Sequence, residues 1–212
     1  MRLVSDTPGF EPLILRAWKA KAVCAAGVLA YYIVGYFTLN RLPLQAYHDV
    51  LKVPFFDDLP IIPWTTVVYN SVFLLGGLGI GLLPDARAVK RYFVSVVFAY
   101  TLNYVFFALY PTRIVRDPLP DSGSMWLWAL RLTRVVDGPY TCFPSLHLTN
   151  CTLVVIGHWH SRYGCWFLLW TLAIAVSTLT TDQHLFLDLP AGAVVAGFGA
   201  FLASKVKGAN RD

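Results

Sequence analysis

The stretch "IIPWTTVVYNSVFLLGGLGIGLL", residues 61–83, carries no charged side chain. About 20 consecutive, mostly apolar residues are enough for a helix to cross the hydrocarbon core of a bilayer. The whole chain has the same character, because 57% of its 212 residues are hydrophobic, only 14% are charged, and its mean hydropathy is +0.56. Soluble domains contain roughly 25% charged residues. The sequence therefore predicts an integral membrane protein with one compact domain.

Six apolar segments match or nearly match the length of a membrane-spanning helix: residues 22–40, 61–83, 92–110, 143–160, 164–181 and 185–204. The first has no small-residue cleavage site, so we interpret it as an uncleaved anchor rather than a signal peptide. The predicted fold class is all-α, an integral membrane bundle of six transmembrane helices over residues 22–204. Residues 205–212 would form a basic cytoplasmic tail.

Residues 1–21 form a separate N-terminal segment. Phe10, Leu13, Ile14 and Trp18 recur at helical spacing, ahead of two lysines. This pattern predicts a short interfacial helix at the membrane surface.

Lysine and arginine residues in the connections predict the orientation, since they concentrate on the cytoplasmic side. The side that holds both termini and the connection with Arg87, Lys90 and Arg91 has 11 of them, and the other side has 6. Both termini are therefore expected in the cytoplasm. We read the net charge of +5 as this topological signal and not as a site for nucleic acid.

No metal or other cofactor is expected. The four cysteines lack the paired spacing of a zinc site or a disulfide framework. His158 and His160 in "HWH" resemble half a metal site but have no acidic or cysteine neighbours, so ordinary boundary residues are the better interpretation.

Three polar clusters are expected at the non-cytoplasmic ends of the apolar segments: "YPTRIVRDP" (110–118), "FPSLH" (143–147) and "DQHLFLD" (182–188). Polar side chains are costly at a membrane boundary and often mark function. Because the clusters are far apart in the chain but reach one side, the topology predicts a shared site.

Each cluster also has a simpler explanation. Pro144 suits the first turn of a helix, which would place Ser145 and His147 at a helix N-terminus that favours anions. His184 and Asp188 are four residues apart, so the carboxylate could orient the imidazole, or Asp188 could simply cap the last helix.

The basic residues are likewise ambiguous. Arg113 and Arg116 could grip a phosphate, or they could be solvated loop residues. Arg131 and Arg134 share one face of a short amphipathic helix in "LWALRLTRVV", where they could contact lipid headgroups or solvent.

The arrangement resembles the type 2 phosphatidic acid phosphatase superfamily of six-helix membrane enzymes over roughly residues 55–204. Its motif P-S-x-H is matched by Pro144, Ser145 and His147, and its later S-R-x5-H-x3-D motif by Ser177, His184 and Asp188. Thr178 replaces the arginine of that motif. The earlier K-x6-R-P motif is degraded, since Leu109 stands at the lysine position and Asp117 separates Arg116 from Pro118. "YPTRIVR" and "DDLPIIPW" (57–64) are closest in style to the inositol phosphorylceramide synthase-like branch.

The resemblance implies a metal-independent mechanism. His184 would attack phosphorus and form a phosphohistidine, Asp188 would orient His184, and His147 would serve as general acid and base. Arg113, Arg116 and Ser145 would bind the phosphate of a lipid phosphate substrate.

Three functions stay open: a lipid phosphatase, which we favour, a phosphotransferase that moves a phosphate-linked headgroup onto a lipid alcohol, and a non-catalytic membrane protein on the same fold. The expected location is the plasma (inner) membrane, multi-pass, among membrane lipids, with the site on the non-cytoplasmic face. The sequence leaves the lipid unnamed and is compatible with a homo-oligomer.

Overall fold

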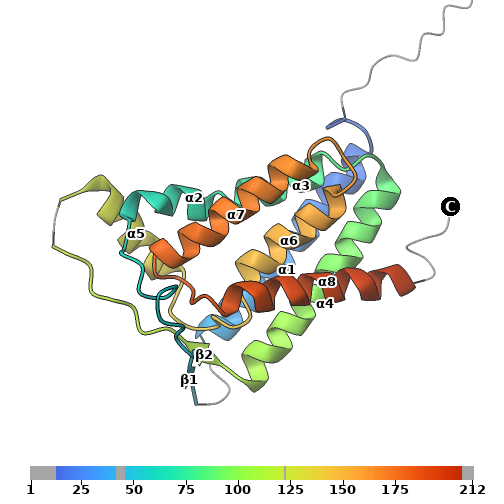
Figure 1. Ribbon diagram of the computed structural model, residues 1–212. Coiled ribbons are helices and arrows are strands. Elements are labelled where there is room, and N and C mark those ends of the chain that lie inside the picture. The colour runs from blue at the N-terminus through green and yellow to red at the C-terminus, as the bar shows by residue number, and fades with distance from the viewer. Residues whose placement is uncertain (1–12, 42–45, 122, 207–212) are drawn as a thin grey trace, which may run out of the picture.

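The computed structural model describes residues 13–41, 46–121 and 123–206, and the chain is mostly helical (Figure 1). Its helices are α1 (Trp18–Arg41), η1 (Pro63–Thr65), α2 (Thr66–Asn70), α3 (Val72–Gly81), α4 (Ala86–Leu109), α5 (Met125–Val136), α6 (Leu146–His158), α7 (Gly164–Thr180) and α8 (Asp188–Lys205). Two short strands, β1 (His48–Asp49) and β2 (Thr112–Arg113), complete the elements.

All six predicted segments contain helices, but they differ in length. The helical stretches Trp18–Asn40, Pro63–Gly81 and Ala86–Leu109 are long and apolar enough to cross a membrane. Helix α6 has only 13 residues because the chain becomes helical at Leu146, after Ser145, instead of at residue 143. The structure thus supports a membrane protein with helices of spanning length, and the arrangement with six spans stays a prediction.

Helix α6 lies at the centre of the bundle, in contact with α3, α4, α7 and α8, while α4 also packs against α1. Glycines allow close approach at these contacts. A Cβ atom on Gly79 of α3 would lie 2.7 Å from a methyl carbon of Val154 on α6, and one on Gly199 of α8 would lie 2.7 Å from the Cβ of Ala99 on α4. Small residues at helix contacts are typical of membrane bundles, where van der Waals packing supplies much of the association.

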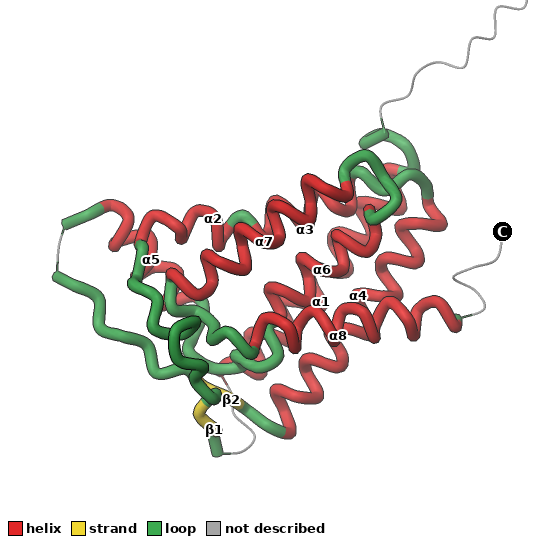
Figure 2. Tube along the Cα trace, in the orientation of Figure 1, coloured by secondary structure: helices red, strands yellow, loops and turns green. Residues whose placement is uncertain are grey.

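The chain is mostly helical, as predicted, and also contains one pair of two-residue strands. Strands β1 and β2 form a parallel pair, in which His48 is opposite Thr112 and Asp49 is opposite Arg113. Main-chain hydrogen bonds join the loops of this region; for example, the amide of Ile114 donates to the carbonyl of Pro139. Figure 2 shows the strands and long loops gathered at one end of the bundle.

The N-terminal segment also differs from the expected interfacial helix. Residues 13–17 form turns, and helix α1 begins at Trp18. The buried ammonium of Lys21 donates hydrogen bonds to the carbonyls of Leu13, at 2.7 Å, and Gly81, at 2.8 Å, which holds these turns against the end of α3. Residues 1–12, with Phe10, lie outside the described residues, as do residues 207–212 of the expected tail.

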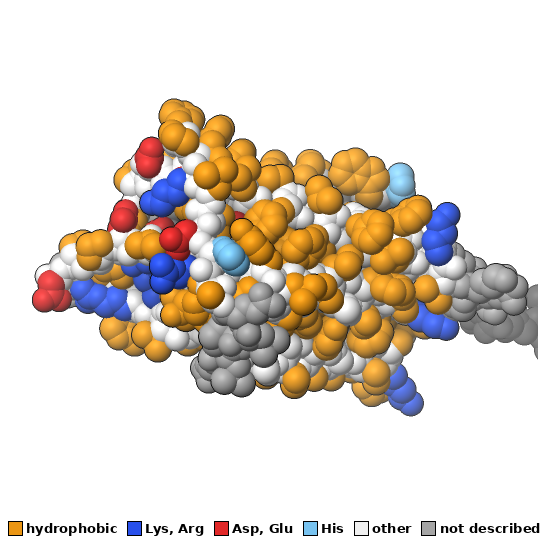
Figure 3. Space-filling model, turned by 90° about the horizontal axis from the view of Figure 1, so that it is seen from below, with side chains coloured by type: hydrophobic (Ala, Val, Ile, Leu, Met, Phe, Trp, Pro, Cys, Tyr) orange, Lys and Arg blue, Asp and Glu red, His pale blue; other side chains and the backbone are white. Residues whose placement is uncertain are grey.

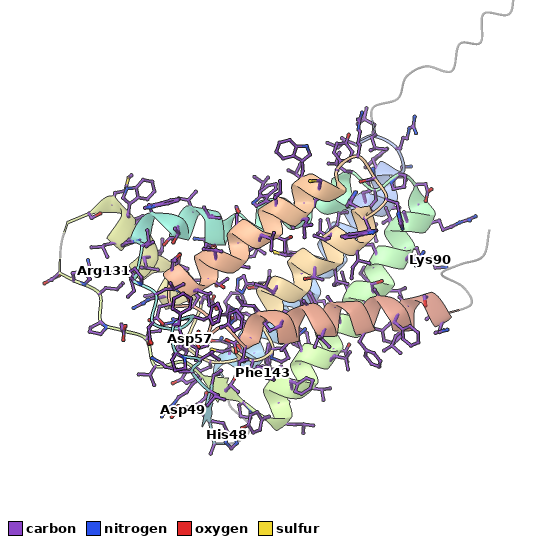
Figure 4. All side chains as sticks on the ribbon, in the orientation of Figure 1. His48, Asp49, Asp57, Lys90, Arg131 and Phe143 are labelled. Atoms are coloured by element: carbon purple, nitrogen blue, oxygen red, sulfur yellow. The ribbon has the colours of Figure 1, made fainter. Side chains whose placement is uncertain are left out.

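The bundle has two distinct ends. We call the loop end the one formed by residues 46–62, 110–121, 137–145 and 181–187, and the short end the one formed by residues 13–17, 82–85 and 159–163. Figure 4 shows Asp49, Asp57 and Arg131 at the loop end and Lys90 at the other. On the face shown in Figure 3, hydrophobic side chains dominate between the two charged ends, as expected for a surface in contact with lipid.

Candidate active site

The N-termini of α6 and α8 meet at the loop end. Ser145 caps α6, because its hydroxyl oxygen accepts a hydrogen bond from the amide of Leu148 at 3.3 Å. Its own amide donates to the carbonyl of Asp188, the first residue of α8, at 3.0 Å. A Cβ on Gly192 would lie 2.3 Å from the carbonyl oxygen of Ser145, so only glycine permits this approach. Pro144 accordingly precedes the cap instead of lying in the first helical turn.

Asp188 and His184 form the hydrogen-bonded pair that their spacing suggested. The distance from His184 Nδ1 to Asp188 Oδ2 is 3.2 Å. The same oxygen accepts a hydrogen bond from the amide of Leu185 at 2.9 Å, so Asp188 both orients the imidazole and fixes the turn before α8. His184 lies in this turn and not on a helix face. The pairing therefore depends on the turn and not on helical spacing.

The two histidines touch directly. His184 Nε2 lies 3.3 Å from His147 Nδ1, and the exposed fractions of His147, His184 and Asp188 are 7%, 6% and 0%. An ionised Asp188 assigns a hydrogen to His184 Nδ1, which leaves a lone pair on Nε2. His147 then donates to that lone pair through Nδ1. The resulting chain from carboxylate to imidazole to imidazole leaves one polarised nitrogen, His184 Nε2, facing a group that can hold a proton.

A second carboxylate, Asp137, approaches His147 through an aromatic ring. The ring of Tyr69 lies 4.7 Å from the ring of His147, and its hydroxyl donates to Asp137 Oδ2. Tyr36 donates to the other oxygen, and Asn40 Nδ2 in turn donates to the Tyr36 hydroxyl at 3.2 Å. Sequence analysis did not select Asp137, Tyr69 or Tyr36. The available signal was a single carboxylate, Asp137, between the amphipathic helix α5 and the "FPSLH" cluster.

The two arginines expected to bind phosphate have different surroundings. Arg113 Nε pairs with Asp49 Oδ1 at 2.7 Å, and its side chain is 49% exposed. Arg116 instead points inward, where it donates to the carbonyl of Asp137 at 2.8 Å, to the carbonyl of Gly138 at 3.2 Å and to the side chain of Gln183. Gln183 precedes His184, so only Arg116 is linked to the histidine pair by described contacts. Phosphate binding by either arginine stays a prediction.

Arg134 joins Arg116 at this position. As expected, residues 131 and 134 lie on one amphipathic helix, α5, but only Arg134 turns inward, and it pairs with Asp182 Oδ2 at 3.0 Å. Burial lowers the pKa of Arg134 and raises that of Asp182. Asp182 also accepts a hydrogen bond from the amide of Asp117 at 2.8 Å, which ties the loop around residue 182 to the loop around residue 117.

Several buried polar atoms at the loop end have no hydrogen-bond partner within the described structure. They are the Nε atoms of Arg116 and Arg134, Gln183 Nε2 and Asp188 Oδ1. Buried groups without partners are costly, so a cluster of them is often completed by a ligand or water. Here two donors belong to cations, which suits an anionic ligand.

The other sequence candidates have no comparable surroundings. His158 Nε2 lies 2.8 Å from the carbonyl oxygen of Gly79, and His160 is exposed. Among residues 13–41, 46–121 and 123–206, no group of three or more histidine, cysteine or acidic side chains is placed to hold a metal ion. The four cysteines are free thiols.

Two cavities reach His147. One, of about 220 Å³, lies between α1, α2 and α5 and includes Asp137 and Tyr69 in its lining. The other, of about 300 Å³, lies between α1, α3, α4 and α6. His147 therefore lies where two largely apolar cavities meet, one of which also contains the carboxylate of Asp137.

The chain matches no family model, no curated protein and no solved structure. A functional interpretation therefore depends on the motif residues and on the geometry described above.

Proposed function

We propose that the protein is a membrane-embedded lipid phosphatase that hydrolyses a lipid phosphate or diphosphate through a phosphohistidine. The observation that carries this proposal is the buried chain Asp188–His184–His147, with successive distances of 3.2 Å and 3.3 Å. A carboxylate that holds one ring nitrogen leaves the other available as a nucleophile. A non-catalytic protein would have no need for this alignment.

In the first step, the lone pair of His184 Nε2 attacks phosphorus, and the bond from phosphorus to the lipid oxygen breaks. His147, in its protonated form, transfers a proton to the departing oxygen, so a lipid alcohol leaves (or a lipid monophosphate, if the substrate is a diphosphate). The substrate phosphate must separate the two imidazoles, whose contact in the resting protein is a replaceable hydrogen bond. Asp188 accepts a hydrogen bond from the Nδ1–H group of His184 throughout and stabilises the positive ring.

In the second step, His147 takes a proton from water, and the water oxygen attacks phosphorus. The bond between phosphorus and His184 Nε2 breaks, inorganic phosphate leaves, and both imidazoles return to their starting states. These two reaction steps require no oxidant, metal or other cofactor.

Charge on the phosphoryl oxygens has several nearby partners. The N-terminus of α6 offers backbone amides and its dipole, and the cation of Arg116 is linked to Gln183 beside His184. The Ser145 hydroxyl accepts from Leu148, which leaves its hydrogen available as a donor. Donors fixed before the reaction stabilise developing charge most effectively. We assign the phosphate to Arg116 and Ser145, with Arg113 further from the reaction.

We also propose that all six apolar segments cross the membrane, with the loop end on the non-cytoplasmic face, on the basis of the 11-to-6 distribution of basic residues. Asp121→Cys at the loop end should react with an impermeant thiol reagent applied to intact cells, in a Cys165→Ser background that removes the exposed native thiol. Ala86→Cys at the short end should not react. The reverse pattern would place the histidine pair on the cytoplasmic side.

A phosphotransferase is the second candidate, and the two cavities favour it. Both spaces reach His147, the proposed general base, so a lipid alcohol as well as water could approach the residue that activates the second nucleophile. Both functions share the first step and differ only in the second nucleophile.

The test uses purified protein in detergent with a panel of lipid phosphates, with and without diacylglycerol or ceramide, and in the presence of EDTA. We expect release of inorganic phosphate that is unaffected by the added alcohols and the chelator. A new phospholipid formed at the expense of phosphate release would establish the transferase. Loss of turnover with EDTA, restored by one metal, would rule out the phosphohistidine scheme.

A further inference from the structure

The apolar cavity beside His147 has a defined path through the bundle. We call it the α1–α3 cavity; its volume is about 300 Å³ and its lining includes Tyr32, Phe73, Gly77 and Tyr100 as well as His147. Helices α3 and α6 run side by side in the same direction here, because Gly76 approaches Asn150 and Gly79 approaches Val154. The cavity therefore starts at the candidate active site and extends toward the short end.

The length of this space matches a chain rather than a compact group. On α3 the lining extends from Val72 to Ile80. At a rise of about 1.5 Å per residue, these eight steps correspond to about 12 Å along the helix axis. A cavity that long, with His147 of the histidine pair at one end, suits an elongated ligand whose phosphate lies between His147 and His184.

The lining is chemically suited to hydrocarbon. It contains no Asp, Glu, Lys or Arg side chain, and the hydroxyl of Tyr100 is already engaged with Asn150 Oδ1 at 3.2 Å. Apolar side chains and aromatic rings provide most of the remaining wall. Burial of each additional methylene group in such surroundings strengthens binding, so the affinity should rise with the length of the hydrocarbon chain.

The cavity also communicates with the lipid-facing surface. Phe73 and Leu29, which belong to its wall, are each more than half exposed. Helix α1 is the least buried of the three helices of spanning length. A hydrocarbon chain could thus enter sideways between α1 and α3 without leaving the bilayer. The rings of Tyr32 and Phe73, 6.0 Å apart, line both cavities and separate the apolar space from the one around Asp137.

From these observations we infer that the α1–α3 cavity binds one hydrocarbon chain of the substrate and thereby selects phosphate esters of long-chain lipids. This inference rests on the proposed function, because it takes His147 as the position of the phosphate. It adds a binding site for the apolar part of the substrate, with Gly77 in the wall of that site.

Gly77 allows a sharp test, since a Cβ at this position would meet no atom within 4 Å. Gly77→Ala and Gly77→Leu should therefore be accommodated by the fold while filling the cavity in two steps. Gly197 on α8 is the matched control, because a Cβ there also meets nothing within 4 Å and the residue lies outside both cavity linings. Melting temperatures in detergent check that all variants fold.

The measured quantity is the ratio of kcat/KM for dodecyl phosphate to kcat/KM for butyl phosphate. We expect Gly77→Leu to lower this ratio at least about 10-fold, equivalent to 1.4 kcal/mol. Gly77→Ala should give an intermediate value, and Gly197→Leu should leave the ratio unchanged. If the wild type cleaves both esters and the Gly77 variants keep its ratio, the chain-binding site is wrong while the proposed function stands.

A second measurement does not need turnover. In the His184→Ala background, dodecyl phosphate with a diazirine at its chain end should label peptides from α1, α3 or α4, and Gly77→Leu should remove that labelling. Labelling of this kind without any cleavage by the wild type would support the chain site and reject the proposed function. Labelling that Gly77→Leu does not change would reject the chain site.

Discussion

The two ends of the bundle each hold a buried histidine, His158 at the end of α6 and His184 in the turn before α8, and their hydrogen-bond partners distinguish the two ends. At the short end, His158 bonds the carbonyl oxygen of Gly79 at 2.8 Å and lies 3.4 Å from the hydroxyl of Ser161. At the loop end, His184 bonds a carboxylate and a second imidazole. A main-chain partner satisfies a ring nitrogen, whereas titratable partners can also hold or receive its proton.

Unsatisfied polar atoms sharpen the same contrast. Both buried guanidinium nitrogens that lack a partner among the described residues belong to Arg116 and Arg134, at the loop end. The buried cation of the short end, the ammonium of Lys21, instead donates hydrogen bonds to two main-chain carbonyls. The described buried cation of the short end is therefore satisfied by main-chain carbonyls, whereas the guanidinium groups of the loop end retain capacity for an anion.

The strongest test of this comparison substitutes each of the two histidines in a separate variant. His184→Ala removes the proposed nucleophile, so turnover of the lipid phosphate should fall by at least about 10³-fold. His158→Gln keeps a donor toward Gly79 and should leave turnover unchanged. The readout is phosphate release per molecule of folded protein, and equal losses in the two variants would contradict the assignment of the site.

Asp188→Asn should have the next largest effect, about 10²- to 10⁴-fold on kcat, because an amide can stabilise the wrong imidazole tautomer and carries no charge. The amide oxygen can still accept from Leu185, which limits structural change. The control is the thermal melting curve in detergent. A normal kcat in a folded Asp188→Asn variant would show that the carboxylate only caps the turn.

The two arginines provide an internal comparison within the loop end. Arg116→Ala should lower kcat/KM by about 10²-fold, the loss expected when one fixed donor to developing charge is removed. Arg113→Ala should change it much less, since its side chain is exposed and paired with Asp49. If Arg113→Ala is the more damaging substitution, the phosphate binds nearer to β2 than we propose. Arg116→Lys keeps the positive charge but loses the guanidinium hydrogen bonds to the carbonyls of Asp137 and Gly138, so its kcat/KM shows which of the two matters more.

Tyr69→Phe should produce the smallest effect. It keeps the ring against His147 but removes the hydrogen bond to Asp137, worth about 1 kcal/mol, so kcat should fall by less than about 10-fold. Tyr163→Phe at the short end removes a contact with Arg162 and should leave kcat unaltered. A loss in Tyr69→Phe as large as that in Asp188→Asn would make the Asp137 network part of the catalytic group.

Hydropathy and spacing predicted much of this molecule without tertiary information. The apolar runs coincide with helices because a helix pairs the backbone N–H and C=O groups of an apolar segment within that segment. The chain direction of those helices then placed "YPTRIVRDP", "FPSLH" and "DQHLFLD" at the same end. The pairing of His184 with Asp188 was also local, although a turn rather than a helix produces it.

Side-chain direction in the loops depended on contacts between distant segments. The sequence treats Arg113 and Arg116 alike, and only the strand pairing that sets Arg113 beside Asp49 separates their roles. Residues 13–17 form turns instead of the expected interfacial helix, because the ammonium of Lys21 binds the carbonyls of Leu13 and Gly81. Such partners have no signature in local composition.

The sequence by itself thus determined the membrane class, the helical segments and the set of residues at the loop end. Only the tertiary structure decided that His147 touches His184, that Asp137 reaches His147 through Tyr69, and that a cavity opens at Gly77. The physical reason is the distance along the chain between the interacting residues. Hydrophobic burial and helix formation are read along the chain, whereas the close approach of α6 to α8 at Gly192 and of α3 to α6 at Gly79 is set by packing between segments.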